Sequence, residues 1–246
     1  MKWKLIPSDF LNDYEDQLFS IFQAKVEDDE ITITRETSDA IDPSREREQI
    51  QGKLHNFLLS ISLVHRMVAF SLIPTDVIIE SEGTRYLNAE VGMFGLSGMD
   101  IDIISINNDG QIVVDSKKER ELRQQELFEL ISDYGADPTV VKILESYKNA
   151  LDHDEKLLVY LYEIRDTLSN YFGNDETAKQ MLNISSRKWS EFGTLANDRR
   201  INQSRHYLEV TPNSREITEK ERNSAFSFAQ TMIESFLYYL KQYGNK

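Results

Sequence analysis

The chain has 246 residues, a formal net charge of −14 and no cysteine. The lack of cysteine excludes disulfide bonds, zinc sites built from thiolates and cysteine nucleophiles. Only 10 glycines and 5 prolines are present, which excludes a collagen-like or low-complexity chain. The acidic charge disfavours non-specific binding to nucleic acid, although it leaves room for a local basic site.

The N-terminal sequence MKWKLIPSDF has no apolar signal core, and no apolar run along the chain is long enough to span a bilayer. The absence of cysteine is compatible with a reducing compartment. We therefore expect a soluble, cytoplasmic protein that has no membrane partner.

The charge is unevenly distributed along the chain. Residues 1–150 carry 15 Lys/Arg and 28 Asp/Glu, whereas residues 151–246 carry 13 and 14. Hydrophobic residues make up 40% of the chain, which is enough for a substantial core. The change in charge predicts a domain boundary near residue 150, with an α+β domain before it and an all-α domain after it.

Helices and strands alternate in the first predicted domain. The apolar spacing predicts helices over 8–24, from Ser44 to about Leu72, after Lys117 as far as Tyr134, and over 139–150. Pro74 is expected to end the second of these helices. Short runs rich in β-branched residues predict strands over 31–34, 77–80 and 85–91.

Only helices are predicted after residue 150. Amphipathic spacing predicts them over 154–172, 175–182 and 186–196. Thr218 and Glu221 have the spacing of a capping box, which predicts the start of a strong final helix.

The stretch Gly98–Lys118 predicts an acidic β-hairpin, because apolar runs flank the turn sequence Asn107-Asn108-Asp109-Gly110. If Asp109-Gly110 form the turn, Ile104 faces Asp115 and Asp102 faces Lys117. If Asn108-Asp109 form it, Asp102 faces Asp115. Side chains alternate between the faces of a strand, so either register places Asp100, Asp102, Asp115 and Lys117 on one face, whereas a loop of odd length would not. Clustered carboxylates repel one another, and Mg²⁺ would relieve that repulsion.

This order of helix, strands, acidic hairpin and helix resembles the PD-(D/E)xK nuclease superfamily over residues 44–135. The resemblance implies that Asp102 (or Asp100) and Asp115 hold Mg²⁺ while Lys117 activates water and stabilises the developing charge on phosphate. Two departures are that no proline precedes the first Asp and that the second acid is Asp instead of Glu. The alternative is a solvated hairpin face with ordinary surface charges.

A second segment, Asn197–His206, has the sequence NDRRINQSRH. It resembles the Arg-x4–6-His motif of HEPN ribonucleases, which are all-α domains, with either Arg199 or Arg200 as the arginine. The resemblance implies that His206 is a metal-independent acid or base and that the arginine binds phosphate. It also implies a homodimer through the helical domain, because HEPN enzymes pair two motifs across a dimer. The alternative is a basic loop between helices.

Residues 177–196 have the rhythm of a helix-turn-helix, with a turn at Asn183-Ile184-Ser185. Arg187 and Lys188 would begin the recognition helix, where such proteins contact DNA. The alternative is a packed corner between two helices, with Trp189 in the core.

The leading hypothesis from the sequence is a metal-dependent nuclease of a prokaryotic defence or toxin system. Asp102, Asp115 and Lys117 would form its catalytic site, and Asp100 would be a further metal ligand. Arg187, Lys188, Arg199 and Arg205 would contact nucleic acid. The alternatives are a HEPN-type ribonuclease that uses Arg200 and His206, and a non-catalytic protein that binds DNA or another protein.

Overall fold

The structure is a computed structural model, and it divides the chain into two compact units. The first unit comprises residues 1–58 and 69–97, and the second comprises residues 59–68 and 98–246. The residues that the structure describes are 2–6, 15–27, 30–33, 43–65, 71–78, 85–87, 104–106, 112–206 and 214–244. The boundary predicted near residue 150 falls in the last turn of helix α4 (Pro138–Asp152), which packs against the next helix, α5 (Leu157–Tyr171), inside the second unit.

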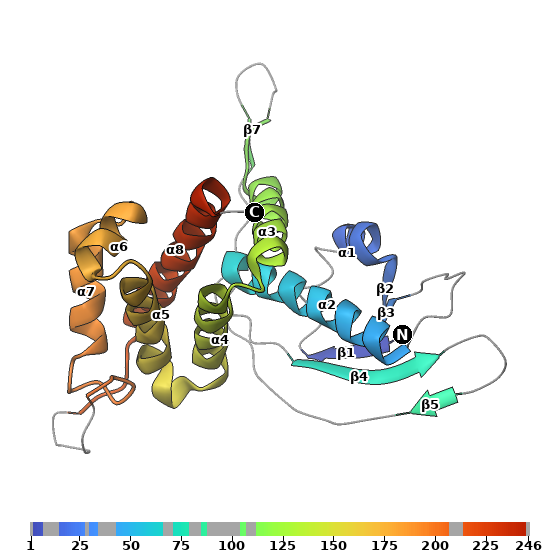
Figure 1. Ribbon diagram of the computed structural model, residues 1–246, viewed down its shortest axis with the longest axis horizontal. Coiled ribbons are helices and arrows are strands. Elements are labelled where there is room, and N and C mark those ends of the chain that lie inside the picture. Colours follow the sequence, from blue (N-terminus) through green and yellow to red (C-terminus); the bar gives the residue numbers. More distant parts are fainter. Residues whose placement is uncertain are drawn as a thin grey trace. The chain divides into compact units, whose positions relative to one another are not determined.

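Two helices and five short strands are described in or at the edge of the first unit (Figure 1). The helices are α1 (Glu15–Phe22) and α2 (Pro43–His65). The strands are β1 (Lys2–Ile6), β2 (Ala24–Glu27), β3 (Glu30–Ile33), β4 (Ser71–Ile78) and β5 (Arg85–Leu87). They pair antiparallel in the order β2-β3-β1-β4-β5. Phe22 and Phe57 pack edge to face, with ring centroids 6.1 Å apart.

The prediction that the second helix continues to Leu72 is wrong, because Leu72 and Pro74 lie in β4, opposite Leu5 and Trp3 of β1. The strands β1 and β2 were not predicted. Since the described residues of this unit are short segments separated by undescribed ones, a complete N-terminal α+β domain stays a prediction.

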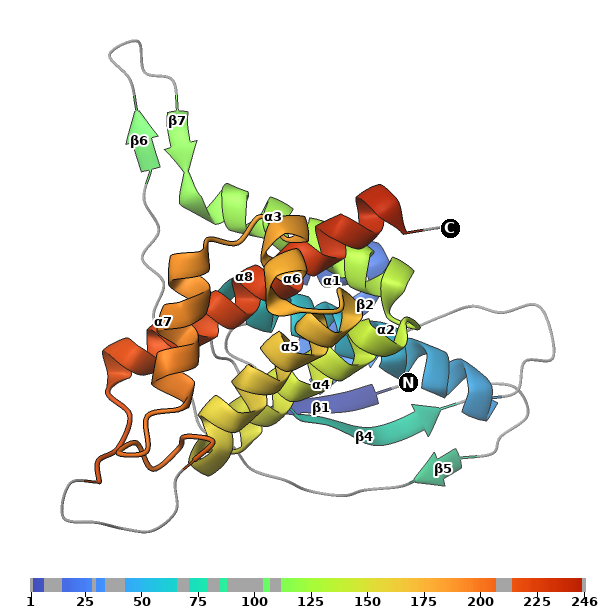
Figure 2. The same ribbon diagram turned by 60° about the vertical axis from the view of Figure 1, so that its left-hand side comes forward.

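The second unit is mostly helical, and the predicted all-α character of the C-terminal part is confirmed. Its helices are α3 (Ser116–Tyr134), α4 (Pro138–Asp152), α5 (Leu157–Tyr171), α6 (Asp175–Met181), α7 (Ser186–Ala196) and α8 (Glu219–Tyr243), with a short 3-10 turn, η2 (Asp154–Lys156), before α5. Helix α5 packs against α4, α6, α7 and α8, and lies between α7 and α4 in two views (Figures 1 and 2). No helix of the described residues is long and apolar enough to cross a membrane.

Side-chain caps explain where these helices begin. Asp137 accepts hydrogen bonds from the backbone amides of Thr139 and Val140 at 2.7 and 3.1 Å, which starts α4. Thr218 and Glu221 form the predicted capping box at the start of α8. These caps satisfy backbone amides that have no partner within a helix.

A buried polar contact joins three segments of the second unit. The Tyr147 hydroxyl donates to the Ser62 carbonyl at 3.2 Å and accepts from the Gln230 amide at 2.9 Å. Because a buried polar group is costly when it has no partner, these bonds favour one register of α4 against α8.

Candidate nucleic-acid interface

The acidic hairpin is described in part. Strands β6 (Ile104–Ile106) and β7 (Ile112–Asp115) pair antiparallel, with Ile104 opposite Asp115, as the Asp109-Gly110 turn would require. The register then shifts between Ser105 and Ile106. Asp100, Asp102 and the turn lie outside the described residues.

Lys117 does not lie on the hairpin strand, where the sequence placed it. Strand β7 ends at Asp115 and runs directly into α3, which begins at Ser116 (Figure 2). The alternation of side chains holds only along a strand, so it does not place Lys117 on the face of Asp115; Lys117 is exposed on the first turn of α3. Within the described part of the chain no three His, Asp or Glu side chains are grouped as metal ligands, and a Mg²⁺ site that includes Asp100 and Asp102 stays a prediction.

The two helices predicted for the helix-turn-helix are present as α6, a short turn and α7, and Trp189 is buried, as the alternative of a packed corner between helices also predicted. Asn174 caps α6 by accepting from the Thr177 amide at 2.9 Å, and Ser185 caps α7 by accepting from the Lys188 amide at 3.3 Å. Asn183 turns the chain between them with φ of 52°, in the left-handed region that asparagine tolerates better than most residues. The inner face of the motif is buried and contains Ala178, Leu182, Ile184, Trp189, Phe192 and Ala196.

A mostly buried arginine, which the sequence did not reveal, joins the motif to α5. The Arg165 side chain is 12% exposed and forms an ion pair with Asp175, at the start of α6. Its guanidinium lies 4.9 Å from the Tyr162 ring centroid and 5.1 Å from that of Trp189, and it donates to the Tyr162 hydroxyl at 3.0 Å. Cation–π contacts of this kind stabilise a partly desolvated arginine. The cluster therefore fixes both helices of the motif against α5.

The charge of Asp175 is part of this cluster. Burial would raise the pKa of Asp175, but hydrogen bonds from Ser169, at 2.5 Å, and from Arg165 outweigh burial and lower that pKa below its ordinary value. Asp175 therefore remains a carboxylate at neutral pH and holds Arg165 in place.

The outer face of α7 is polar and open to solvent. Its exposed residues are Ser186, Arg187, Lys188, Ser190, Glu191 and Thr194. The Arg187 and Glu191 side chains are 87% and 59% exposed, and Arg187 Nε donates to Glu191 Oε1 at 2.7 Å. Arg187 and Lys188 thus lie where the sequence placed them, on the first turn of the second helix.

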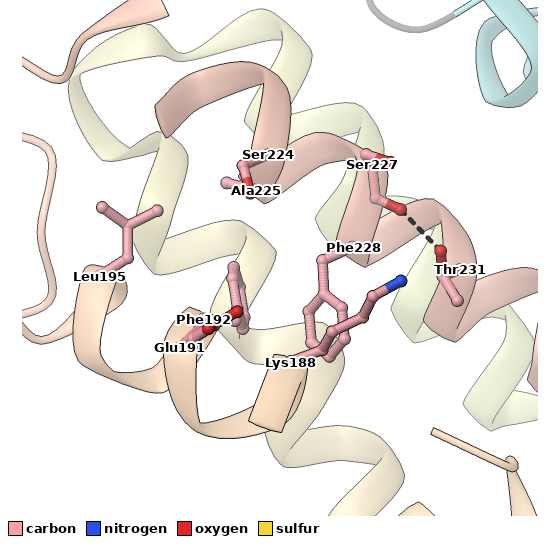
Figure 3. A pocket seen from close by; sticks show the side chains of 9 residues that line it. All are labelled: Lys188, Glu191, Phe192, Leu195, Ser224, Ala225, Ser227, Phe228 and Thr231. Carbon is pink, nitrogen blue, oxygen red and sulfur yellow. Dashed lines mark hydrogen bonds between the residues drawn. The ribbon is translucent and has the colours of Figure 1, made fainter. Parts of the chain in front are cut away.

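A groove runs beside this face, between α7 and α8 (Figure 3). Phe192 and Phe228 form its apolar floor, with ring centroids 5.2 Å apart, and Lys188 and Glu191 lie along its edge. Its volume of about 230 Å³ is smaller than the roughly 300–1,000 Å³ of most small-molecule pockets.

The basic segment Asn197–His206 is an irregular loop after α7, as its alternative reading predicted. Arg200 donates to Asp198 through Nε at 2.9 Å and Nη2 at 2.7 Å, and its carbonyl accepts from the Arg215 amide at 2.7 Å. Arg205 lies 3.9 Å from the Tyr162 ring centroid and 3.3 Å from Asp166. Arg199 and His206 are exposed.

The HEPN resemblance implies that Arg200 binds phosphate. Because Asp198 already pairs with Arg200 through two hydrogen bonds, that role requires this pair to open.

Two carboxylates anchor this loop with depressed pKa values. Hydrogen bonds from the Arg200 side chain lower the pKa of Asp198 to about 2, and hydrogen bonds from the Arg215 side chain lower the pKa of Glu221 to about 2. Arg215 donates to both Glu221 oxygens, at 2.7 and 2.8 Å. Backbone bonds between Arg200, Asn202 and Arg215 then join the loop to the segment before α8.

We expect the stability that Glu221 supplies to disappear in acid. A depressed folded-state pKa stabilises the protein above the unfolded-state value, which is 4.5, and this stabilisation is lost as the pH falls to about 2. Glu221→Gln keeps an acceptor for the capping box but removes the charge. The melting temperature of the variant should be lower than that of the wild type at pH 7, and the difference should shrink between pH 5 and pH 2. A difference that is constant over this range would contradict the assignment.

Comparisons with known proteins returned no matching family model, no matching curated protein and no matching solved structure. The candidate site is therefore defined by its geometry alone, as two capped helices, α6 and α7, with two basic side chains exposed on the first turn of α7.

Proposed function

We propose that the second unit binds duplex DNA, with α7 as the recognition helix, and that this binding does not require catalysis. The observation that carries the proposal is the position of Arg187 and Lys188, which are exposed on the first turn of the second helix of a capped helix-turn-helix. In proteins of this architecture, the N-terminal residues of that helix contact base edges in the major groove. The N-terminal part of the chain, which we expect to be an α+β domain, would be an accessory to this unit.

Local charge supports the proposal despite the acidic chain. Residues 186–206 contain five Lys/Arg and two Asp/Glu, within a chain whose net charge is −14. Arg199 is exposed on the loop that follows α7, where it is available to contact phosphate. Because the rest of the chain repels DNA, binding should depend on few contacts, and hence should be modest and sensitive to salt.

We expect Arg187→Ala/Lys188→Ala to weaken duplex binding by at least about tenfold in low salt, because it removes one base-reading and one phosphate-binding cation. The slope of log K against log salt should fall by about one unit for each lost phosphate contact. Fluorescence anisotropy with a labelled duplex pool, at several salt concentrations, measures both quantities.

The matched control is Lys142→Ala/Lys148→Ala, which removes the same charge from α4. These lysines form surface ion pairs with Glu163 and Asp152. Equal weakening by both double variants would show that bulk charge, and not α7, determines binding. The absence of any salt-dependent duplex binding by the wild type would overturn the proposal.

The same samples test the two catalytic hypotheses. Cleavage of the duplex or of RNA that requires Mg²⁺, is stopped by EDTA and is lost in Asp115→Ala would favour the acidic hairpin. Cleavage that survives EDTA and is lost in His206→Ala would favour the HEPN-type reaction and its predicted homodimer. We expect binding without cleavage.

A further inference from the structure

An exposed cation of α7, Arg187, is hydrogen-bonded to an acid on the same helix, Glu191. Arg187 and Glu191 are four residues apart, a spacing that brings two side chains together on one face of a helix. The hydrogen bond between them runs from Nε of Arg187 to Oε1 of Glu191, at 2.7 Å. The two terminal amino groups of this guanidinium take no part in that hydrogen bond, and the side chain is 87% exposed.

The planar fork of Arg187 and the carboxylate beside it decide which ligand this side chain can bind. Its terminal amino groups form a planar fork that matches a pair of acceptors. In the major groove of B-DNA, guanine presents such a pair, O6 and N7, whereas adenine presents one acceptor and one donor. A carboxylate beside the arginine repels backbone phosphates, so the pair Arg187–Glu191 is better suited to a base edge than to the backbone.

We infer that α7 reads a guanine through the two terminal amino groups of Arg187 and that Glu191 is a positioning residue, which holds the guanidinium end-on to the base. This inference rests on the proposed duplex binding. The neighbouring Lys188 lies at the edge of the groove between α7 and α8, and no described residue forms an ion pair with it. We therefore assign Lys188 to the phosphate backbone and Arg187 to the base.

The test begins with the full chain and a pool of random duplexes, from which bound sequences are selected. Each recurring guanine is then replaced by 7-deazaguanine, which lacks the N7 acceptor, or by inosine, which keeps O6 and N7 and loses only the minor-groove amino group. At one guanine, 7-deazaguanine should weaken binding by about 5- to 150-fold, whereas inosine should have little effect. In Arg187→Ala this difference should vanish.

The role of Glu191 has a separate signature. Glu191→Ala should raise the affinity for unselected DNA, because a negative charge is lost, and should reduce the discrimination against 7-deazaguanine, because Arg187 is no longer oriented. Glu191→Gln keeps an acceptor for Nε and should retain the discrimination. A residue with a purely structural role would not separate affinity from discrimination in this way.

The outcomes distinguish the two proposals. If the wild type binds no duplex, the proposed function fails and the inference fails with it. If the wild type binds duplexes but selects no guanine, or if its discrimination survives Arg187→Ala, the inference alone is overturned. If discrimination is lost in Arg187→Ala but unchanged in Glu191→Ala, Arg187 reads the base and the positioning role of Glu191 is wrong.

Discussion

Trp189→Ala is expected to lower the free energy of unfolding of the second unit by about 3–5 kcal/mol, the usual cost of truncating a large buried aromatic residue. Trp189 is 2% exposed and is among the largest fully buried side chains of the described residues. Its ring contacts Phe228 edge to face, with centroids 6.2 Å apart, and lies against the guanidinium of Arg165. The substitution therefore removes the packing that joins α7 to both α8 and α5. Denaturant unfolding followed by circular dichroism measures the loss.

Trp189→Ala should also affect duplex binding, although indirectly, through the loss of stability. A loss of about 3–5 kcal/mol is a large part of the roughly 5–15 kcal/mol that stabilises a typical domain, so Trp189→Ala should also lose duplex binding although Trp189 is not on the outer face of α7. Trp189→Phe keeps an aromatic ring in the same place and should cost much less in both assays. If Trp189→Ala cost less than about 1 kcal/mol, below the range for buried aromatic residues, the packing of α7 described here would be wrong.

The helices of the second unit could be predicted closely from the sequence because their signals are local. Ser185 and Thr218 cap α7 and α8, and the amphipathic spacing between caps fixes which side is buried. The ion pair of Arg187 with Glu191 is local as well, since four-residue spacing is enough to suggest it. The starts of α7 and α8 and the pairing of Arg187 with Glu191 could therefore be predicted from the sequence.

The errors arose where local signals are ambiguous. The apolar run before Pro74 fits a buried helix or a buried strand equally well by periodicity, and residues near Leu72 pair with β1 instead of continuing α2. Lys117 follows a strand by two residues, and nothing in its own sequence shows that α3 has already begun at Ser116. The geometric argument for the acidic hairpin depended on that boundary.

The Arg165 cluster could not be predicted, because it depends on tertiary packing. Arg165 and Asp175 lie on different helices, and their pairing depends on how α6 docks against α5. The one sign of this cluster in the sequence is Gly193, a glycine inside the predicted helix 186–196. Such a glycine is costly in a helix and often has a packing reason.

Gly193→Ala is expected to destabilise the second unit, whereas the same substitution stabilises an ordinary helix. Alanine in place of glycine normally stabilises a helix by about 1 kcal/mol, but a Cβ on Gly193 would collide with Nη1 of Arg165. The guanidinium cannot move away easily, because it is paired with Asp175, bonded to Tyr162 and held against the rings of Tyr162 and Trp189. Gly193→Ala should therefore destabilise the second unit by about 1–3 kcal/mol, as overpacking usually does.

In the background of Arg165→Ala the obstacle is absent, and Gly193→Ala should instead stabilise the unit by up to about 1 kcal/mol. A double-mutant cycle, measured by denaturant unfolding, isolates this coupling. Gly52 of α2, which lies in the first unit, is the control for the helix propensity of alanine alone, because nothing lies within 4 Å of a Cβ built there; Gly52→Ala should stabilise the first unit whether or not Arg165 is present. If Gly193→Ala has the same effect in both backgrounds, Arg165 is not what requires a glycine at this position, and the close approach of α5 to α7 must have another cause.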